Sequence, residues 1–415
     1  MSNIYPTLSL KERDRRWGLV RELMKNKGLD CLIVVGLRGR GQFDGYLTNE
    51  VYMGIVVFPS EGKPTYLTWN AMFITRHMEH CSRGEIPWIE DIRIGTAGKD
   101  IVAVLREKGL DSASIGVVGL ESRGLGEPEG CISYKSWTHI VKHLPKSTFI
   151  DVSQLFDQMT FIKSEEEISL IRYSAHIGEM ACQAMLDIAR PGISESEIYA
   201  NIMKEIFTHM ASPSPGATYL ILHSGVDNPS WGPPMWLYQA QPPRIVKRGE
   251  VVQAEIFPHY GGLETQQQMV VALKPLHEVN EKCARVARQS YEAGLKSLRP
   301  GKRFQEIVDV MEVPLANAGF WHLTPLIHSL NPYICLGPMG VGIEQLPGIE
   351  KYSQVTELET PMVGGDVVIK SGMVFELEPN ACSGKHRINI GGTVLITEDG
   401  VEELNKLPTE MRVVD

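Results

Sequence analysis

The hydrophobic pattern of the chain changes near residue 160, and this change constrains the fold more than any other feature of the sequence. Before it, short apolar runs such as 31–35 and 115–120 alternate with amphipathic segments such as 11–27, which is typical of an α/β domain with a mixed sheet. After it, capping boxes at Ser164–Glu167 and Ser194–Glu197 each precede a long helical segment. β-rich segments and two more helices follow. We therefore predict an α/β domain over 1–159 and an α+β domain over 160–415.

Charge and cysteine content exclude several kinds of protein. Lys and Arg number 41 against 50 Asp and Glu, and the net charge of −9 argues against a general binder of nucleic acids or anionic membranes. No apolar run approaches the roughly 18 residues that cross a bilayer, and residues 1–10 lack the layout of a signal peptide. The seven cysteines are scattered, without a CxxC pair, so we interpret them as reduced thiols and predict a cytoplasmic protein.

Three segments of the second half carry a resemblance. They are 161–168, then 249–255 with 260–262, then 372–379 with 393–400. In order and spacing they resemble the creatinase, prolidase and aminopeptidase P superfamily, whose fold is called pita-bread. The resemblance implies a pita-bread domain over 160–415 behind a smaller creatinase-type domain over 1–159. It also implies a homodimer, in which the first domain of one subunit lies near the active site of the other.

The metallopeptidases of this superfamily hold two metal ions with two Asp, one His and two Glu. Transferred onto this chain, those positions are Glu255, Gln266, Met339, Glu378 and Gly391, with Gln267 or Gln268 in place of Gln266 if the turn differs in length. Divalent ions prefer anionic oxygens and imidazole, whereas an amide is a poor ligand, a thioether is soft and glycine offers no side chain. We therefore predict that the protein holds no metal and needs no cofactor.

The resemblance and the altered metal positions together favour a metal-independent, creatinase-like hydrolase. It would cleave a C–N bond of a small polar molecule, which could be neutral or cationic. Three alternatives stay open: a lyase on the same scaffold with a Glu base, a metallohydrolase of the Xaa-Pro peptidase kind, and a binding protein without catalysis.

The carboxylates Glu255 and Glu378 are the first candidates for catalysis, because two acids in one enclosed site acquire different pKa values and can act as acid and base. We expect them to face each other across the sheet; the alternative is that they only hydrogen-bond to neighbouring glutamines. The other catalytic candidates are Asp227, which stands where creatinase has its general-base histidine, and the histidines His223 and His259.

Substrate contacts are expected from several segments. Alternation along a strand puts Gln266 and Gln268 on one face, in the pocket or at a solvated edge. An aromatic segment could hold a cationic head group or could simply pack its own rings, and the arginines of a Gly-rich loop could reach a substrate carboxylate. The predicted substrate-binding residues are Gln266, Gln268, His328, Met339, Trp231, Trp236, Tyr238, Arg38 and Arg40.

Overall fold

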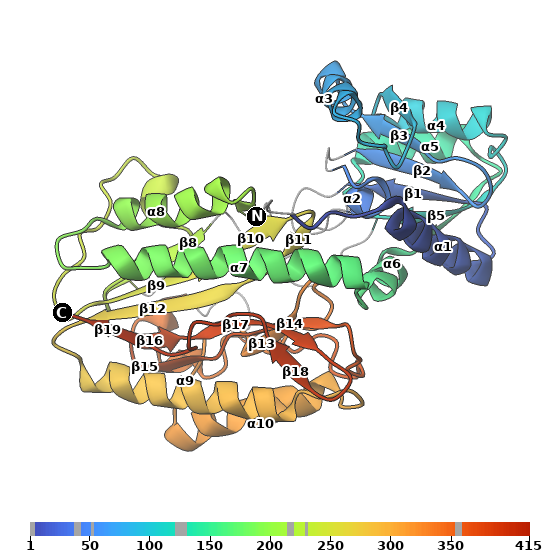
Figure 1. Cartoon of the computed structure of the whole chain (residues 1–415). Helices are drawn as coiled ribbons and strands as arrows, with labels where there is room; N and C mark the ends of the chain where they lie inside the picture. The colour runs from blue at the N-terminus through green and yellow to red at the C-terminus, as the bar shows by residue number, and fades with distance from the viewer. Residues whose placement is uncertain are drawn as a thin grey trace. The chain divides into compact units, whose positions relative to one another are not determined.

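The computed structural model describes residues 5–36, 43–50, 54–120, 131–213, 220–228, 231–352 and 359–415. The chain forms two compact units, Met1–Glu166 and Glu167–Asp415 (Figure 1). This division falls in the first turn of α7 (Glu165–Ile188), whereas the sequence placed it at 159/160, at the end of α6 (Ser153–Thr160). Among helices in the described part of the chain, none combines the length and hydrophobicity that a membrane crossing requires.

The first unit is built on a six-stranded mixed sheet with strand order β4-β3-β2-β1-β5-β6. Strand β1 pairs in parallel with β5 and antiparallel with β2. All five residues of β1 are buried, and successive side chains enter two different hydrophobic clusters, so both faces of the sheet are covered. The strands are β1 (Cys31–Val35), β2 (Ile55–Pro59), β3 (Thr65–Thr68), β4 (Asp91–Ile94), β5 (Ser114–Val118) and β6 (Thr148–Asp151). Besides α6, the helices are α1 (Leu10–Lys27), α2 (Phe43–Thr48), α3 (Ala71–Ser82), α4 (Gly98–Glu107) and α5 (Tyr134–His143).

The second unit is built on a larger sheet with strand order β13-β14-β17-β12-β9-β8, and β18 and β19 pair with β17 and β12. Its strands are β8 (Leu220–Ser224), β9 (Val251–Ile256), β12 (Gln267–Leu273), β13 (Ile327–Ser329), β14 (Val374–Leu377), β17 (Gly391–Ile396), β18 (Val401–Glu403) and β19 (Arg412–Val414). Two smaller sheets hold β7 (Ser212–Pro213), β10 (Pro258–Tyr260) and β11 (Leu263–Glu264), and the hairpin of β15 (Asn380–Ser383) and β16 (His386–Asn389).

Four helices accompany the larger sheet: α7, α8 (Glu195–Thr208), α9 (Glu278–Ser297) and α10 (Phe304–Ala318). Figure 1 shows α7 and α8 on one side of it and α9 and α10 on the other. The predicted capping box opens α8: Ser194 Oγ accepts from Glu197 N at 3.2 Å, and Glu197 Oε2 accepts from Ser194 N at 3.0 Å.

The two faces of this sheet differ in chemistry. Val252, Ala254 and Ile256 of β9, with Met269 and Val271 of β12, pack in one hydrophobic cluster with α7 and α8. Because side chains alternate along a strand, the residues between them point to the other face. Those residues are mostly polar, and they make the second face the place to look for a functional site.

Candidate active site

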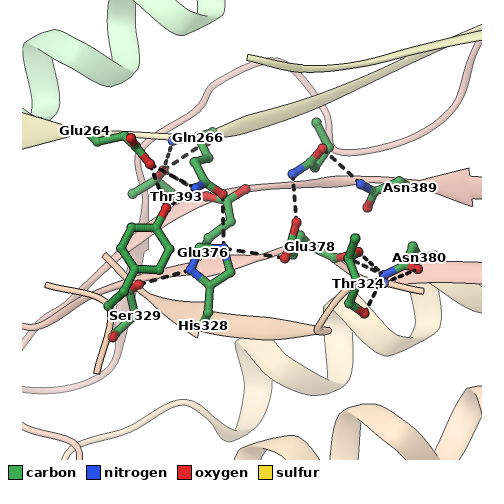
Figure 2. A network of polar contacts seen from close by, with 12 residues as sticks. Glu264, Gln266, Thr324, His328, Ser329, Glu376, Glu378, Asn380, Asn389 and Thr393 are labelled. Atoms are coloured by element: carbon green, nitrogen blue, oxygen red, sulfur yellow. Dashed lines mark hydrogen bonds and ion pairs between the residues drawn. The ribbon is translucent and has the colours of Figure 1, made fainter. Parts of the chain in front are cut away.

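A network of buried polar side chains lies on this second face (Figure 2). We call it the central polar cluster. Its members come from β11, β12, β13, β14, β16, β17 and the segments that join them: Glu264, Gln266, Gln268, His328, Tyr333, Glu376, Glu378, Asn389 and Thr393. The predicted alternation is present, since Gln266 and Gln268 both enter the cluster. The Gln267 amide lies instead on the α7 side, near Gly178.

Glu378 follows β14 directly, and its backbone N donates to Leu326 O at 2.9 Å. Its side chain is only 3% exposed. Glu378 Oε2 accepts a hydrogen bond from Gln268 Nε2 at 3.2 Å, and Oε1 lies 3.5 Å from His328 Nε2. Asn389 Nδ2 donates to Gln268 Oε1 at 3.0 Å, which fixes the orientation of that amide. A buried carboxylate thus has an amide donor on one oxygen and an imidazole on the other.

Hydrogen-bond geometry assigns the protonation of His328. Nδ1 lies 3.0 Å from the carbonyl oxygen of Ser329, which can only accept, so Nδ1 carries a proton. Nε2 lies 3.1 Å from Gln266 Oε1. That amide cannot be turned round, because its Nε2 donates to Glu264 Oε1 at 3.0 Å and to the Tyr333 hydroxyl. Both ring nitrogens thus face acceptor oxygens, an arrangement that suits an imidazolium beside the Glu378 carboxylate.

Glu376 is a second buried acid of the cluster. Burial raises the pKa of Glu376 well above its usual value; a hydrogen bond with Thr393 opposes this rise, and the charges of Glu255 and Glu264 add to it. Thr393 Oγ1 donates to Glu376 Oε2 at 2.9 Å and also lies 2.9 Å from Gln266 O. The sequence analysis missed Glu376, although its spacing of two residues from Glu378 places both acids on one face.

That Glu255 and Glu378 face each other across the sheet stays a prediction. Gln268, on the strand between them, pairs in register with Glu255 on β9 and donates to Glu378. Glu255 is buried, and its charge acts on Glu376 and on Arg387. The alternative expectation, carboxylates hydrogen-bonded to neighbouring glutamines, describes Glu378 and Gln268.

A cavity of about 120 Å³ lies further along the same face of the sheet, and we call it the arginine cavity. Its wall includes His223, Gln253, Lys385, His386 and Arg387. Arg387 Nη2 donates to His223 Nε2 at 2.9 Å. Burial, with the charges of Arg387 and Arg244, lowers the pKa of His223 well below its usual value. His223 is therefore a neutral imidazole whose accepting nitrogen is already engaged by Arg387, which does not suit the predicted role of general base.

The predicted aromatic site for a cation is not formed. The Arg387 guanidinium lies 4.5 Å from the centroid of the Trp231 ring, so this ring already holds a cation of the protein itself. Trp236 packs edge-to-face on Tyr199, and the side chain of Tyr238 is 61% exposed. The three rings thus serve separate contacts.

The other predicted residues that the structure describes are not members of the central polar cluster, although one of them, His259, neighbours its member Glu264. Asp227 is exposed in the turn after β8, and His259 pairs in register with Glu264 in the small sheet, where burial lowers the pKa of His259. Met339 forms a backbone bridge with Thr360. The motif placed the imidazole position of the superfamily at Met339, but the imidazole beside Glu378 belongs to His328. Arg38 and Arg40 lie outside the described residues.

The cluster does not have the composition of a two-metal site. Within the described ranges, no group of three or more His, Cys, Asp or Glu side chains converges on a point that could hold a metal ion. Amides occupy the space around Glu378 and His328. A side chain at Gly391 cannot fit, because its Cβ would lie 2.1 Å from Leu377 O and 2.9 Å from Gln268 Cγ.

Comparisons with known proteins relate the chain to hydrolases. The chain is 22% identical to a creatinase from a Bacillus species over 98% of this chain and 93% of that protein. It is also 22% identical to the ectoine hydrolase of Halomonas elongata, over 95% of each chain. The Xaa-Pro dipeptidase of Pyrococcus furiosus is 22% identical over 68% of this chain and 74% of its own length.

Solved structures share the fold. An X-Pro aminopeptidase from Thermotoga maritima superposes with a TM-score of 0.72, covering 96% of this chain and 99% of its own at 18% identity. A prolidase from Thermococcus sibiricus gives a TM-score of 0.74 at 15% identity, covering 98% and 100%. They confirm the predicted pita-bread domain and creatinase-type first domain. The model of the creatinase/prolidase N-terminal domain matches residues 16–162, and that of metallopeptidase family M24 matches 169–398, so the chain belongs to family M24.

Proposed function

We propose that the protein is a metal-independent hydrolase that cleaves a C–N bond of a small polar compound at the central polar cluster. The observation that carries the proposal is the buried Glu378 carboxylate, held between the Gln268 amide and the His328 imidazolium. The names of two relatives that span nearly the whole chain, creatinase and ectoine hydrolase, support hydrolysis of small nitrogen compounds.

In this proposal Glu378 is the general base. It takes a proton from water, whose oxygen adds to the carbon of the C–N bond. His328 gives its Nε2 proton to the leaving nitrogen as the bond breaks. The neutral imidazole then presents a lone pair to Gln266 Oε1, an unfavourable contact, and this favours return of the proton from Glu378 across the 3.5 Å that separate them.

The amides of the cluster would position the substrate. Asn389 Oδ1 is buried and has no hydrogen-bond partner among the described residues. A buried acceptor without a donor is costly, and an N–H group of the substrate would satisfy it. This supports a substrate that carries an amine, amide or amidine nitrogen next to the bond that breaks.

An Xaa-Pro peptidase is the second candidate, favoured by relatives such as the Pyrococcus furiosus dipeptidase. It has less support from the site, because amides and Gly391 stand where the superfamily's metallopeptidases place ligands. A lyase and a non-catalytic binding protein have no separate observation in their favour.

One substrate screen tests the proposal. Creatine, ectoine, small amidines, ureas, guanidino acids, N-acyl amines and X-Pro dipeptides are incubated with the purified protein, and released amine is measured by mass spectrometry. The expected result is turnover of a non-peptide that survives prior treatment with a chelator. Hydrolysis of X-Pro dipeptides alone, dependent on added Mn²⁺, would favour the peptidase instead.

We also propose that the active form is a cytoplasmic homodimer. The dimer is implied by the superfamily, and the compartment is supported by seven cysteines that are all thiols in the structure. Light scattering at micromolar concentration should give about twice the mass of the chain. An active monomer would contradict the dimer.

A further inference from the structure

We propose that the arginine cavity binds a carboxylate group of a ligand. The donors would be Arg387, His223 and Lys385. The inference rests on the proposed function in one respect: the carboxylate would belong to the substrate whose hydrolysis Glu378 assists as general base. The binding itself can be tested without turnover.

The charges of the cavity wall favour an anion. Arg387 and Lys385 contribute positive charge, and the acid on the wall is Glu250. Glu250 Oε2 accepts from Lys247 N at 2.8 Å, and Oε1 lies 3.7 Å from Arg244 Nη2, so this acid has cationic and backbone partners of its own. Burial lowers the pKa of Arg387 to about 10. The charge of the buried Glu255 opposes this shift, and at a pKa of about 10 the guanidinium stays charged at neutral pH.

His223 offers a second donor. Its Nε2 accepts from Arg387, so the proton of the neutral ring is on Nδ1. His223 is 3% exposed, and Nδ1 has no hydrogen-bond partner among the described residues. Buried donors of native proteins are nearly always paired, and a ligand oxygen in the cavity that His223 lines would supply the acceptor.

The size of the cavity favours a small planar anion. Its volume is about 120 Å³, well above the ~10–15 Å³ that one water molecule needs. A carboxylate fits that space and matches the planar fork of an arginine, which binds it through two parallel hydrogen bonds. Phosphate would also fit, and the test below separates the two.

Hydrogen bonds connect the cavity with the central polar cluster. Gln253 Nε2 donates to Arg387 O at 2.8 Å, and Gln253 Oε1 accepts from Asn389 N at 2.8 Å. Asn389 holds Gln268, which donates to Glu378. Arg387 and Asn389 are two residues apart on β16, about 7 Å along a strand. A small molecule anchored at Arg387 would therefore extend toward the proposed catalytic acid.

The test measures binding of acetate, its neutral analogue acetamide, and inorganic phosphate to the full chain at neutral pH, by calorimetry and by thermal shift. Acetate should bind at least tenfold more tightly than acetamide. Arg387→Met should weaken acetate binding about tenfold or more, since a charge-assisted hydrogen bond has that magnitude. Lys385→Gln, at an exposed position that does not endanger folding, should weaken it about threefold. The matched controls Arg285→Met on α9 and Lys204→Gln on α8, both exposed, should bind acetate like the parent.

Equal affinity for acetate and acetamide, or acetate binding that neither Arg387→Met nor Lys385→Gln weakens, would overturn the inference. Phosphate binding tenfold tighter than acetate would overturn the assignment to a carboxylate. If Arg387→Met fails to fold, the acetate affinity of Lys385→Gln is compared with that of its control Lys204→Gln. That comparison then decides whether the cavity binds acetate. Glu378→Gln should bind acetate like the parent. Turnover without acetate binding would therefore refute this inference alone, and acetate binding without turnover would refute only the proposed function.

Discussion

Both units of the molecule bury acids, but they surround them differently. In the first unit Asp44 is buried, and its Oδ2 accepts from Gly54 N at 2.9 Å and from the Tyr66 hydroxyl at 2.6 Å. Glu12, also buried, lies 2.7 Å from Arg15 Nη2 and 2.8 Å from Arg16 Nε. Each of these acids has donors of its own.

In the second unit the acids share their partners. Gln266 contacts both Glu264 and His328, and Gln268 connects Glu378 with Asn389. Changing one member therefore alters the protonation or orientation of the next. A buried acid with donors of its own stabilises local structure, whereas the shared network of the second unit is the one in which we propose that protons are transferred.

Glu378→Gln should give the largest effect and separates the two regions most sharply. It keeps the shape of the side chain and removes the charge, so turnover of the substrate found by screening should fall by about 10²–10⁴, the usual range for general acid–base catalysis. The measurement is kcat, with circular dichroism to confirm folding. Full turnover by this variant would leave the carboxylate without a catalytic role.

His328→Gln should lower kcat about a hundredfold, because the leaving nitrogen loses its proton donor. A purely structural histidine would also give a loss, so the decisive readout is the ring itself. Nitrogen-15 NMR of the parent should show both nitrogens of His328 protonated at neutral pH, and Glu378→Gln should make the ring easier to deprotonate. A neutral ring in the parent would contradict the assigned proton arrangement.

Asp44→Asn is the matched change in the first unit. It should reduce the free energy of unfolding by about 1 kcal/mol, since one hydrogen bond of the buried group is weakened, and should leave kcat within about twofold of the parent. Chemical denaturation and the same turnover assay check this. A hundredfold loss of activity would mean that the first unit also takes part in catalysis.

Glu376→Gln should give the smallest effect, visible in the pH dependence of stability. The raised pKa of Glu376 in the folded state means that the folded protein holds a proton that the unfolded chain releases above about pH 4.5. The free energy of unfolding of the parent should therefore fall, relative to the variant, as pH rises from about 5 to about 8. A constant difference across that range would mean that Glu376 is charged in the folded protein.

Local patterns predicted the fold well, because they depend on neighbours in the chain. The capping box of Ser194 and Glu197 and the alternation of Gln266 and Gln268 are of this kind, and both are present. Contacts between distant segments could not be predicted. The contact of His328 with Glu378 depends on the register of β13 against β14, and that of Arg387 with Trp231 joins a hairpin to a loop far away in the chain. Motif alignment assigned the imidazole to Met339 because it has no information on register.

We propose that this M24 fold catalyses hydrolysis with a carboxylate, an imidazolium and amides instead of two metal ions. The most direct measurement is the turnover rate of protein dialysed against a strong chelator, with metal content determined by elemental analysis of the same sample. The account predicts an unchanged rate at far less than one metal ion per chain. Loss of activity that stoichiometric Mn²⁺, Zn²⁺ or Co²⁺ restores would contradict it.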